Sequence, residues 1–86
     1  MATYTAQYKG HTIVVKKSIP SKRLFVDGEL QDVSAAFFEA GTLLWGRIKS
    51  GDGCGDTVKV RLAYCNPWSF LMTCWIFVND TLISKQ

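Results

Sequence analysis

Apolar and polar residues alternate along most of this chain, in short runs separated by glycine, asparagine and aspartate. The alternation is clearest at 57–64, and the runs at 11–17 and 72–78 are rich in β-branched and aromatic residues. Successive side chains of a β-strand point to opposite faces of a sheet, so a period of two predicts strands with one buried face. The whole pattern predicts about seven or eight short strands. We therefore expect an all-β or mainly β fold, a small antiparallel β-sandwich or barrel.

Short turns connect several of the expected strands. A two-residue hairpin turn needs positive φ at its central positions, which glycine, asparagine and aspartate tolerate best. Three dipeptides between strand-like runs meet this need: Lys9-Gly10, Asp27-Gly28 and Asn79-Asp80. The glycine-rich segment 50–55 is a longer loop, which joins the strands expected at 42–49 and 56–64 as an antiparallel hairpin.

The chain also repeats one pattern. A β-branched run at 12–16 leads to a hairpin at 24–30, and a similar run at 57–61 leads to a hairpin at 76–82. Either the two halves are an internal duplication, or they share features that any pair of hairpins has. If the duplication is real, the second copy has extra residues around 65–71, and insertions in repeats often form loops on a binding face.

Segment 32–40 is ambiguous between helix and strand. Four apolar residues fall on one helical face: Val33, Ala36, Phe37 and Ala40. Asp32 or Ser34 would cap such a helix at its start, and Gly41 would end it. The alternative is a strand that ends near Phe38. We prefer the helix, which makes the fold α+β with at most one short helix.

Length and composition predict one domain over residues 1–86. Nearly half of the residues are hydrophobic (48%) and only 20% are charged, so the chain is rich enough in apolar side chains to fold. The formal net charge of +3 is mild, and does not by itself indicate a nucleic-acid partner. Apolar composition of this extent also suits self-association, and we expect a homodimer or another homo-oligomer.

The cysteines and the start of the chain indicate the compartment. Cys54, Cys65 and Cys74 are an odd number and lack metal-ligand spacing, so a disulfide framework is not expected. Residues 1–5 do not have the pattern of a signal peptide, and no apolar run is long enough to cross a bilayer. We expect a cytoplasmic protein with no membrane association. Its size and lack of catalytic motifs are typical of small proteins encoded by phages and mobile elements.

Two surfaces are candidates for binding. The alternation turns Leu44 and Ile48 inward and places one aromatic and four basic side chains on the opposite face: Trp45, Arg47, Lys49, Lys59 and Arg61. That face would suit phosphates and a stacked base, or an acidic protein surface, or would be only a solvated sheet face. The second candidate is Trp68 and Phe70 on the loop that follows Pro67. These rings resemble the aromatic anchors of protein interfaces, unless they close one end of the sandwich instead.

Catalytic and metal-binding chemistry is poorly represented. His11 is the single histidine, and its position beside the Lys9-Gly10 turn predicts an exposed or edge residue. Asp52 and Asp56 are too few for a calcium site, so 50–55 is expected to be only a flexible loop. We predict no catalytic residue, no metal and no cofactor.

We therefore expect a non-enzymatic interaction module that binds a protein partner or itself, for example a small inhibitor or adaptor. Trp68, Phe70 and Trp45 are its predicted contacts. The first alternative is nucleic-acid binding through the basic face. The second is a barrel that encloses a small ligand against Phe37, Phe38 and the tryptophans.

Overall fold

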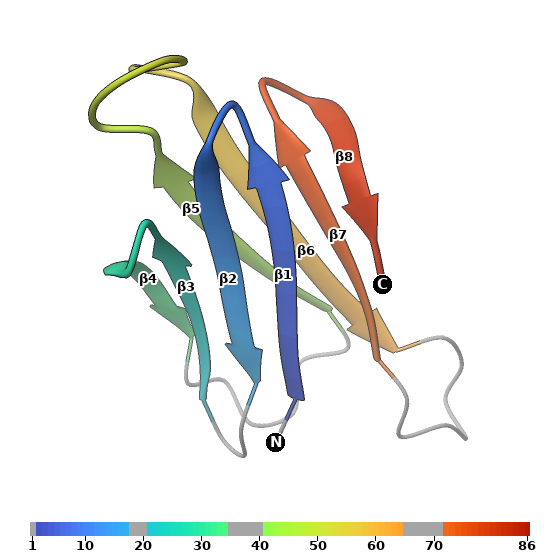
Figure 1. Ribbon diagram of the computed structural model, residues 1–86. Coiled ribbons are helices and arrows are strands. Elements are labelled where there is room, and N and C mark those ends of the chain that lie inside the picture. The colour runs from blue at the N-terminus through green and yellow to red at the C-terminus, as the bar shows by residue number, and fades with distance from the viewer. Residues whose placement is uncertain (1, 18–20, 35–40, 65–71) are drawn as a thin grey trace.

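The protein folds into two four-stranded antiparallel sheets. A computed structural model describes residues 2–17, 21–34, 41–64 and 72–86. These ranges contain eight strands: β1 (Ala2–Tyr8), β2 (His11–Lys17), β3 (Lys22–Val26), β4 (Glu29–Ser34), β5 (Gly41–Arg47), β6 (Thr57–Tyr64), β7 (Met72–Val78) and β8 (Thr81–Lys85). The first sheet has the order β1-β2-β3-β4 and the second β5-β6-β7-β8. In Figure 1 the blue and teal strands of the first sheet lie in front of the second. The predicted β fold is confirmed, as a sandwich of two separate sheets.

The short helix predicted at 32–40 is wrong for its first three residues. Asp32 and Ser34 belong to β4, where they pair with Leu24 and Lys22 of β3. A helix of two turns is marginal by itself, whereas the strand completes a ladder with an existing neighbour. The other predicted helix residues, 35–40, lie outside the described residues. In the ranges that the structure describes there is no helix.

All three predicted two-residue turns have the expected backbone. Lys9 and Gly10 have φ of 47° and 80°, and Asp27 and Gly28 have 51° and 80°. The third turn, Asn79-Asp80, has φ of 50° and 65° without a glycine. Positive φ at both positions gives a twist that matches that of the flanking strands, so each turn leads directly into the next strand.

The core lies between the two sheets, on the inward face of each strand. The first sheet contributes four fully or almost fully buried aliphatic side chains: Ile13, Val15, Leu24 and Val26. The second sheet contributes more of the core: Leu44, Ile48, Val58, Val60, Leu62, Cys74, Ile76 and Val78. These residues alternate with partly buried or exposed ones in the sequence, as the period of two predicts. Removing their apolar surface from water is the main stabilising contribution.

The two sheets repeat one structural unit in detail. The pairing of β3 with β4 shifts register between Leu24 and Phe25, and that of β7 with β8 shifts between Ile76 and Phe77. These are the same positions of the sequence repeat. A bulge at one fixed position is not a general requirement of hairpins, so it supports internal duplication over shared hairpin features.

Side-chain hydrogen bonds close both seams between the sheets. At one seam the backbone N–H of Trp45 in β5 donates to Asp32 Oδ2 in β4 at 2.9 Å. At the other, Gln86 Nε2, just after β8, donates to the backbone oxygen of Thr5 in β1 at 2.8 Å. These bonds satisfy backbone groups on edge strands, which would otherwise offer places for another strand to pair. The two sheets are therefore held together by the core and at both of their margins.

Candidate functional site

The outer face of the second sheet carries large apolar side chains in contact with solvent. Leu43, Trp45 and Leu82 are each about half exposed, at 53%, 49% and 48%. Leu44 and Ile48 of the same segment are fully buried, and Arg47 is exposed. The predicted inward and outward orientations are therefore confirmed for Leu44, Trp45, Arg47 and Ile48.

The register arranges this outer face in two parallel rows across the strands. The first row contains Trp45, Lys59, Phe77 and Leu82, which are successive pairing partners from β5 to β8. The second row contains Leu43, Arg61, Trp75 and Lys85, which lie two residues from the first row in β5, β6 and β7, and three residues from it in β8, across the register shift. We call these eight residues, together with Arg47, the cation–aromatic face. In both rows the cation from β6 lies between apolar side chains of β5 and β7.

The two central cations rest on the neighbouring rings. Lys59 Nζ lies 4.8 Å from the ring centroid of Phe77 and 5.7 Å from that of Trp45. Arg61 Cζ lies 4.9 Å from the ring centroid of Trp75. At these distances the negative face of each ring attracts the cation. The rings and cations are thus held together as one surface, although they come from three strands.

Charge on the cation–aromatic face is almost entirely positive. Strands β5, β6, β7 and β8 contain no aspartate or glutamate. Asp32 Oδ2 of β4 accepts from the backbone N–H of Trp45 at 2.9 Å, and the highly exposed carboxylate of Asp80 in the β7–β8 turn lies 3.3 Å from Lys59 Nζ. An exposed ion pair of this kind contributes little to stability. The other cations of the face are not neutralised by it, so the electrostatic potential there stays positive.

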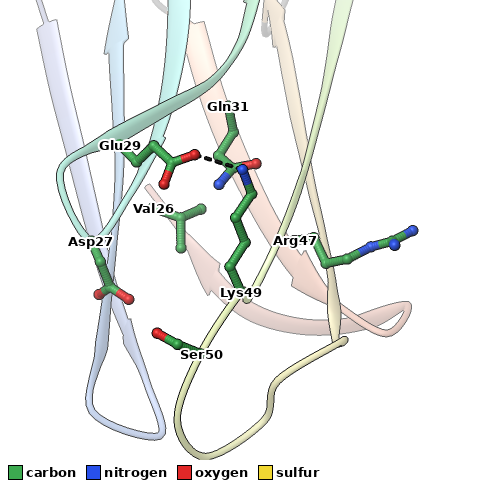
Figure 2. A pocket seen from close by; sticks show the side chains of 7 residues that line it. All are labelled: Val26, Asp27, Glu29, Gln31, Arg47, Lys49 and Ser50. Carbon is green, nitrogen blue, oxygen red and sulfur yellow. Dashed lines mark hydrogen bonds and ion pairs between the residues drawn. The ribbon is translucent and has the colours of Figure 1, made fainter.

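Lys49 does not join the cation–aromatic face, although the sequence predicts it there. Its Nζ pairs with Glu29 Oε1 at 2.6 Å, and the two side chains meet over a pocket of about 240 Å³ between the sheets. Figure 2 shows Lys49 reaching toward Glu29, whereas Arg47 points away from it. The alternation of burial continues through buried Ile48 to exposed Lys49, so Lys49 leaves the face because its long side chain reaches across to the opposite charge of Glu29.

His11 is buried, so the prediction of an exposed histidine is wrong. Its residue exposure is 8%, because the loop at 50–55 lies against the ring. Nδ1 lies 2.5 Å from Asp27 Oδ2, and Nε2 lies 2.7 Å from the backbone oxygen of Asp52. The hydrogen bond to Asp27, and then that to Asp52, raise the pKa of His11 above its ordinary value of 6.5.

The acidic residues of the long loop make contacts within the protein. Tyr8 Oη donates to Asp56 Oδ2 at 2.6 Å, and this bond lowers the pKa of the Asp56 carboxyl and raises that of the Tyr8 phenol. Among the described residues, no three His, Cys, Asp or Glu side chains come together as metal ligands would. Cys54 is an exposed free thiol, and burial raises the pKa of the Cys74 thiol to about 12.

Two of the predicted protein contacts, Trp68 and Phe70, lie outside the described residues, as do Phe37 and Phe38 of the ligand-barrel alternative. Trp45, Arg47, Lys59 and Arg61 lie together on the cation–aromatic face. Sequence reasoning missed the other five residues of that face: Leu43, Trp75, Phe77, Leu82 and Lys85. The signal was present, since Trp75 and Phe77 alternate with the buried residues Cys74, Ile76 and Val78.

Comparisons with other proteins assign no family. No family model, curated protein or solved structure matches this chain significantly. Within residues 2–17, 21–34, 41–64 and 72–86 there is also no helix that could span a bilayer. The chemistry of the chain's own surfaces is therefore the basis for a functional proposal.

Proposed function

We propose that this protein is a small non-enzymatic module that binds single-stranded nucleic acid on its cation–aromatic face. The observation that supports this most is the pair of rows in which Lys59 and Arg61 lie between apolar and aromatic neighbours. Proteins that bind single strands combine basic side chains, which follow the phosphates, with rings on which bases stack. Both components are present here within one sheet surface.

The spacing of the rings suits an extended strand. Trp45 and Phe77 are two strands apart, which corresponds to about 10 Å, and Trp75 is two residues from Phe77, about 7 Å away. Successive unstacked bases can therefore meet successive rings while their phosphates lie near the cations. In a duplex the base faces are already stacked on one another, so we expect the single strand to be preferred.

The same face suits a second copy of this chain less well. A twofold symmetric dimer through the cation–aromatic face would place this face against its own copy. Lys59 and Arg61 would then lie opposite cations of the other copy. Like charges at an interface are unfavourable. The homodimer stays a prediction that these contacts do not test, as does the protein site at Trp68 and Phe70.

The other observations are consistent with a binding role in the cytoplasm. Both ring nitrogens of His11 have hydrogen-bond partners within the protein, Asp27 and the backbone oxygen of Asp52, as a histidine with a structural role does. Cys54 is an exposed thiol whose Sγ lies 3.3 Å from the backbone oxygen of Lys49. An exposed unpaired thiol suits a reducing compartment.

The direct test is fluorescence anisotropy with labelled 12-nucleotide single strands of DNA and RNA, at 50 mM and 200 mM salt. If about three phosphates are neutralised, the affinity should fall about 20-fold between these two salt concentrations. A duplex of the same length should bind more weakly. A 12-residue acidic peptide serves as the control for a protein partner. Absence of oligonucleotide binding at 50 mM salt, or preferential binding of the peptide, would contradict the proposal.

A further inference from the structure

His11 lies where three separate segments of the chain meet. The ring belongs to the first residue of β2, Asp27 to the turn between β3 and β4, and Asp52 to the loop between β5 and β6. A methyl group on Gly51 would lie 3.5 Å from His11 Cε1, so this loop packs directly on the ring. The first two segments belong to the first sheet and the third to the second. The imidazole therefore connects the sheets at the end of the sandwich that carries these turns.

Both partners of the ring can only accept hydrogen bonds. Asp52 offers a backbone carbonyl oxygen to Nε2, and Asp27 offers a carboxylate oxygen to Nδ1. Hydrogen bonds from His11 and from the backbone N–H of Thr12 lower the pKa of Asp27, which favours its ionised form. Each ring nitrogen must then carry a proton to make its bond, and only the imidazolium carries two.

We infer that His11 is a pH-dependent latch, whose charged form holds the 50–55 loop against the Asp27-Gly28 turn. A neutral imidazole can donate from only one nitrogen. The carboxylate of Asp27 is the stronger acceptor, so Nδ1 keeps its proton and Nε2 presents a lone pair to the Asp52 oxygen. Two facing acceptors repel each other, and the loop is released from the ring.

Besides Asp27, the ionisable side chains near His11 are those of Tyr8, Lys9, Asp52 and Asp56. Tyr8 faces His11 in the β1–β2 pairing, but its hydroxyl is bonded to Asp56. Lys9 Nζ lies over the Tyr8 ring, 5.5 Å from its centroid. The side-chain charge of Asp52 adds to that of Asp27 in favouring the imidazolium. The hydrogen bond between Tyr8 and Asp56 lowers the pKa of the Asp56 carboxyl and raises that of the Tyr8 phenol, so neither of these two groups changes charge near neutral pH.

Release of the loop has a defined structural consequence. The pocket in Figure 2 has Asp27 and Glu29 on one side and Lys49 and Ser50 on the other. Besides the latch, the ion pair between Lys49 and Glu29 ties these two sides together, and both of its side chains are more than half exposed. Such a pair is weak, so loss of the latch allows the pocket to widen at Asp27 and Ser50, while the hydrogen bond between Trp45 and Asp32 still joins β4 to β5.

The test is an NMR titration of the whole chain from pH 5 to pH 9, which follows the His11 ring protons and the backbone amides of 51–55. We expect the ring to titrate above pH 6.5, and the loop amides to shift with the same midpoint. Asp27→Asn should lower this common midpoint, because the anionic partner is lost. The variant should fold, since Asn79 occupies the equivalent turn position of the second sheet.

Two controls separate the latch from general effects of pH. Lys49→Met removes the other tie across the pocket and should change the His11 midpoint far less than Asp27→Asn does. His11→Gln should abolish the pH-dependent shift of the loop amides. A His11 ring that titrates at or below pH 6.5, or loop amides that do not share its midpoint, would overturn the inference. Neither outcome depends on whether the protein binds nucleic acid.

Discussion

Asp27 and Asn79 occupy equivalent positions in the two sheets and make the same pair of hydrogen bonds. Asp27 Oδ1 accepts from the backbone N–H of Thr12 at 2.9 Å, and Asn79 Oδ1 accepts from that of Thr57 at 3.0 Å. The backbone N–H of Asp27 and Asn79 in turn donate to the carbonyl oxygens of these threonines, both at 2.9 Å. Each hairpin turn is thereby fastened to the strand beside it.

The contribution of the turn's side-chain hydrogen bonds to the free energy of unfolding can be measured by substitution of Asn79. Asn79→Gly keeps the positive φ and removes the side-chain hydrogen bonds to Thr57 and Asp56, and should lower the free energy of unfolding by about 1–2 kcal/mol. Asn79→Ala also forces a side chain with Cβ into positive φ, and should cost roughly 1–2 kcal/mol more. Urea denaturation measures both values. Equal losses for the two variants would show that the turn relaxes to another conformation.

The cation–aromatic face predicts a local effect of charge reversal. Arg61→Glu should weaken binding of a 12-nucleotide single strand by at least tenfold and make the binding less dependent on salt, because phosphate contacts are lost. Arg23→Glu is the matched control, since it makes the same change of charge at an exposed position of the first sheet. Equal losses from both variants would mean that net charge, and not this face, determines the affinity.

Trp45 is predicted to contribute stacking and little stability. Stacking of one base on an aromatic ring contributes about 1–3 kcal/mol, so Trp45→Ala should weaken binding of the single strand about 5-fold to 150-fold. Trp45→Phe should retain part of the affinity. Because the ring is half exposed, the midpoint of urea unfolding should change little in either variant. Leu30→Ala, at an equally exposed apolar position of the first sheet, should leave the affinity unchanged.

The pair of His11 and Asp27 predicts a maximum of stability in mildly acidic solution. The pKa of His11 is raised in the folded protein, so its contribution is complete below pH 6.5 and is lost as pH rises through the folded value. The pKa of Asp27 is lowered, so its contribution is complete above about pH 3.8 and is lost as pH falls through the folded value. The free energy of unfolding should therefore be highest between these two pH values.

Urea denaturation from pH 3 to pH 9 measures this profile. In Asp27→Asn the decline above pH 6.5 should become shallower, because the histidine loses most of what raises its pKa. A free energy of unfolding that keeps rising from pH 6 to pH 8 would contradict the assignment of a hydrogen-bond acceptor to each ring nitrogen of His11.

Most strand positions and all three two-residue turns followed from local pattern. The strand predicted at 72–78 is β7, and the dipeptides chosen as turns have positive φ at both residues. Such features depend on residues that are close in sequence. The same local pattern predicted which side chains point outward: Trp45, Arg47, Lys59 and Arg61. Once one position of a strand is known to be buried, the period of two determines which face of the sheet each neighbouring side chain points to.

The errors occurred where distant segments meet. The 50–55 loop buries His11, Glu29 draws Lys49 away from the basic stripe, and pairing with β3 extends β4 through Asp32 and Ser34. In each case the local pattern permitted two arrangements, and a partner eight or more positions away selected one of them. Trp75 and Phe77 became part of the candidate site for the same reason, because only the β6–β7 register places them beside Lys59 and Arg61.

The amino-acid sequence by itself determined two repeated units of short strands, their turns, and which side chains of each strand face the core, because strand geometry and turn chemistry are local. Only the tertiary structure decided which rings and cations form one surface and which imidazole is held between two acceptors. Those arrangements depend on strand register and on the packing of one sheet against the other, which no short segment encodes.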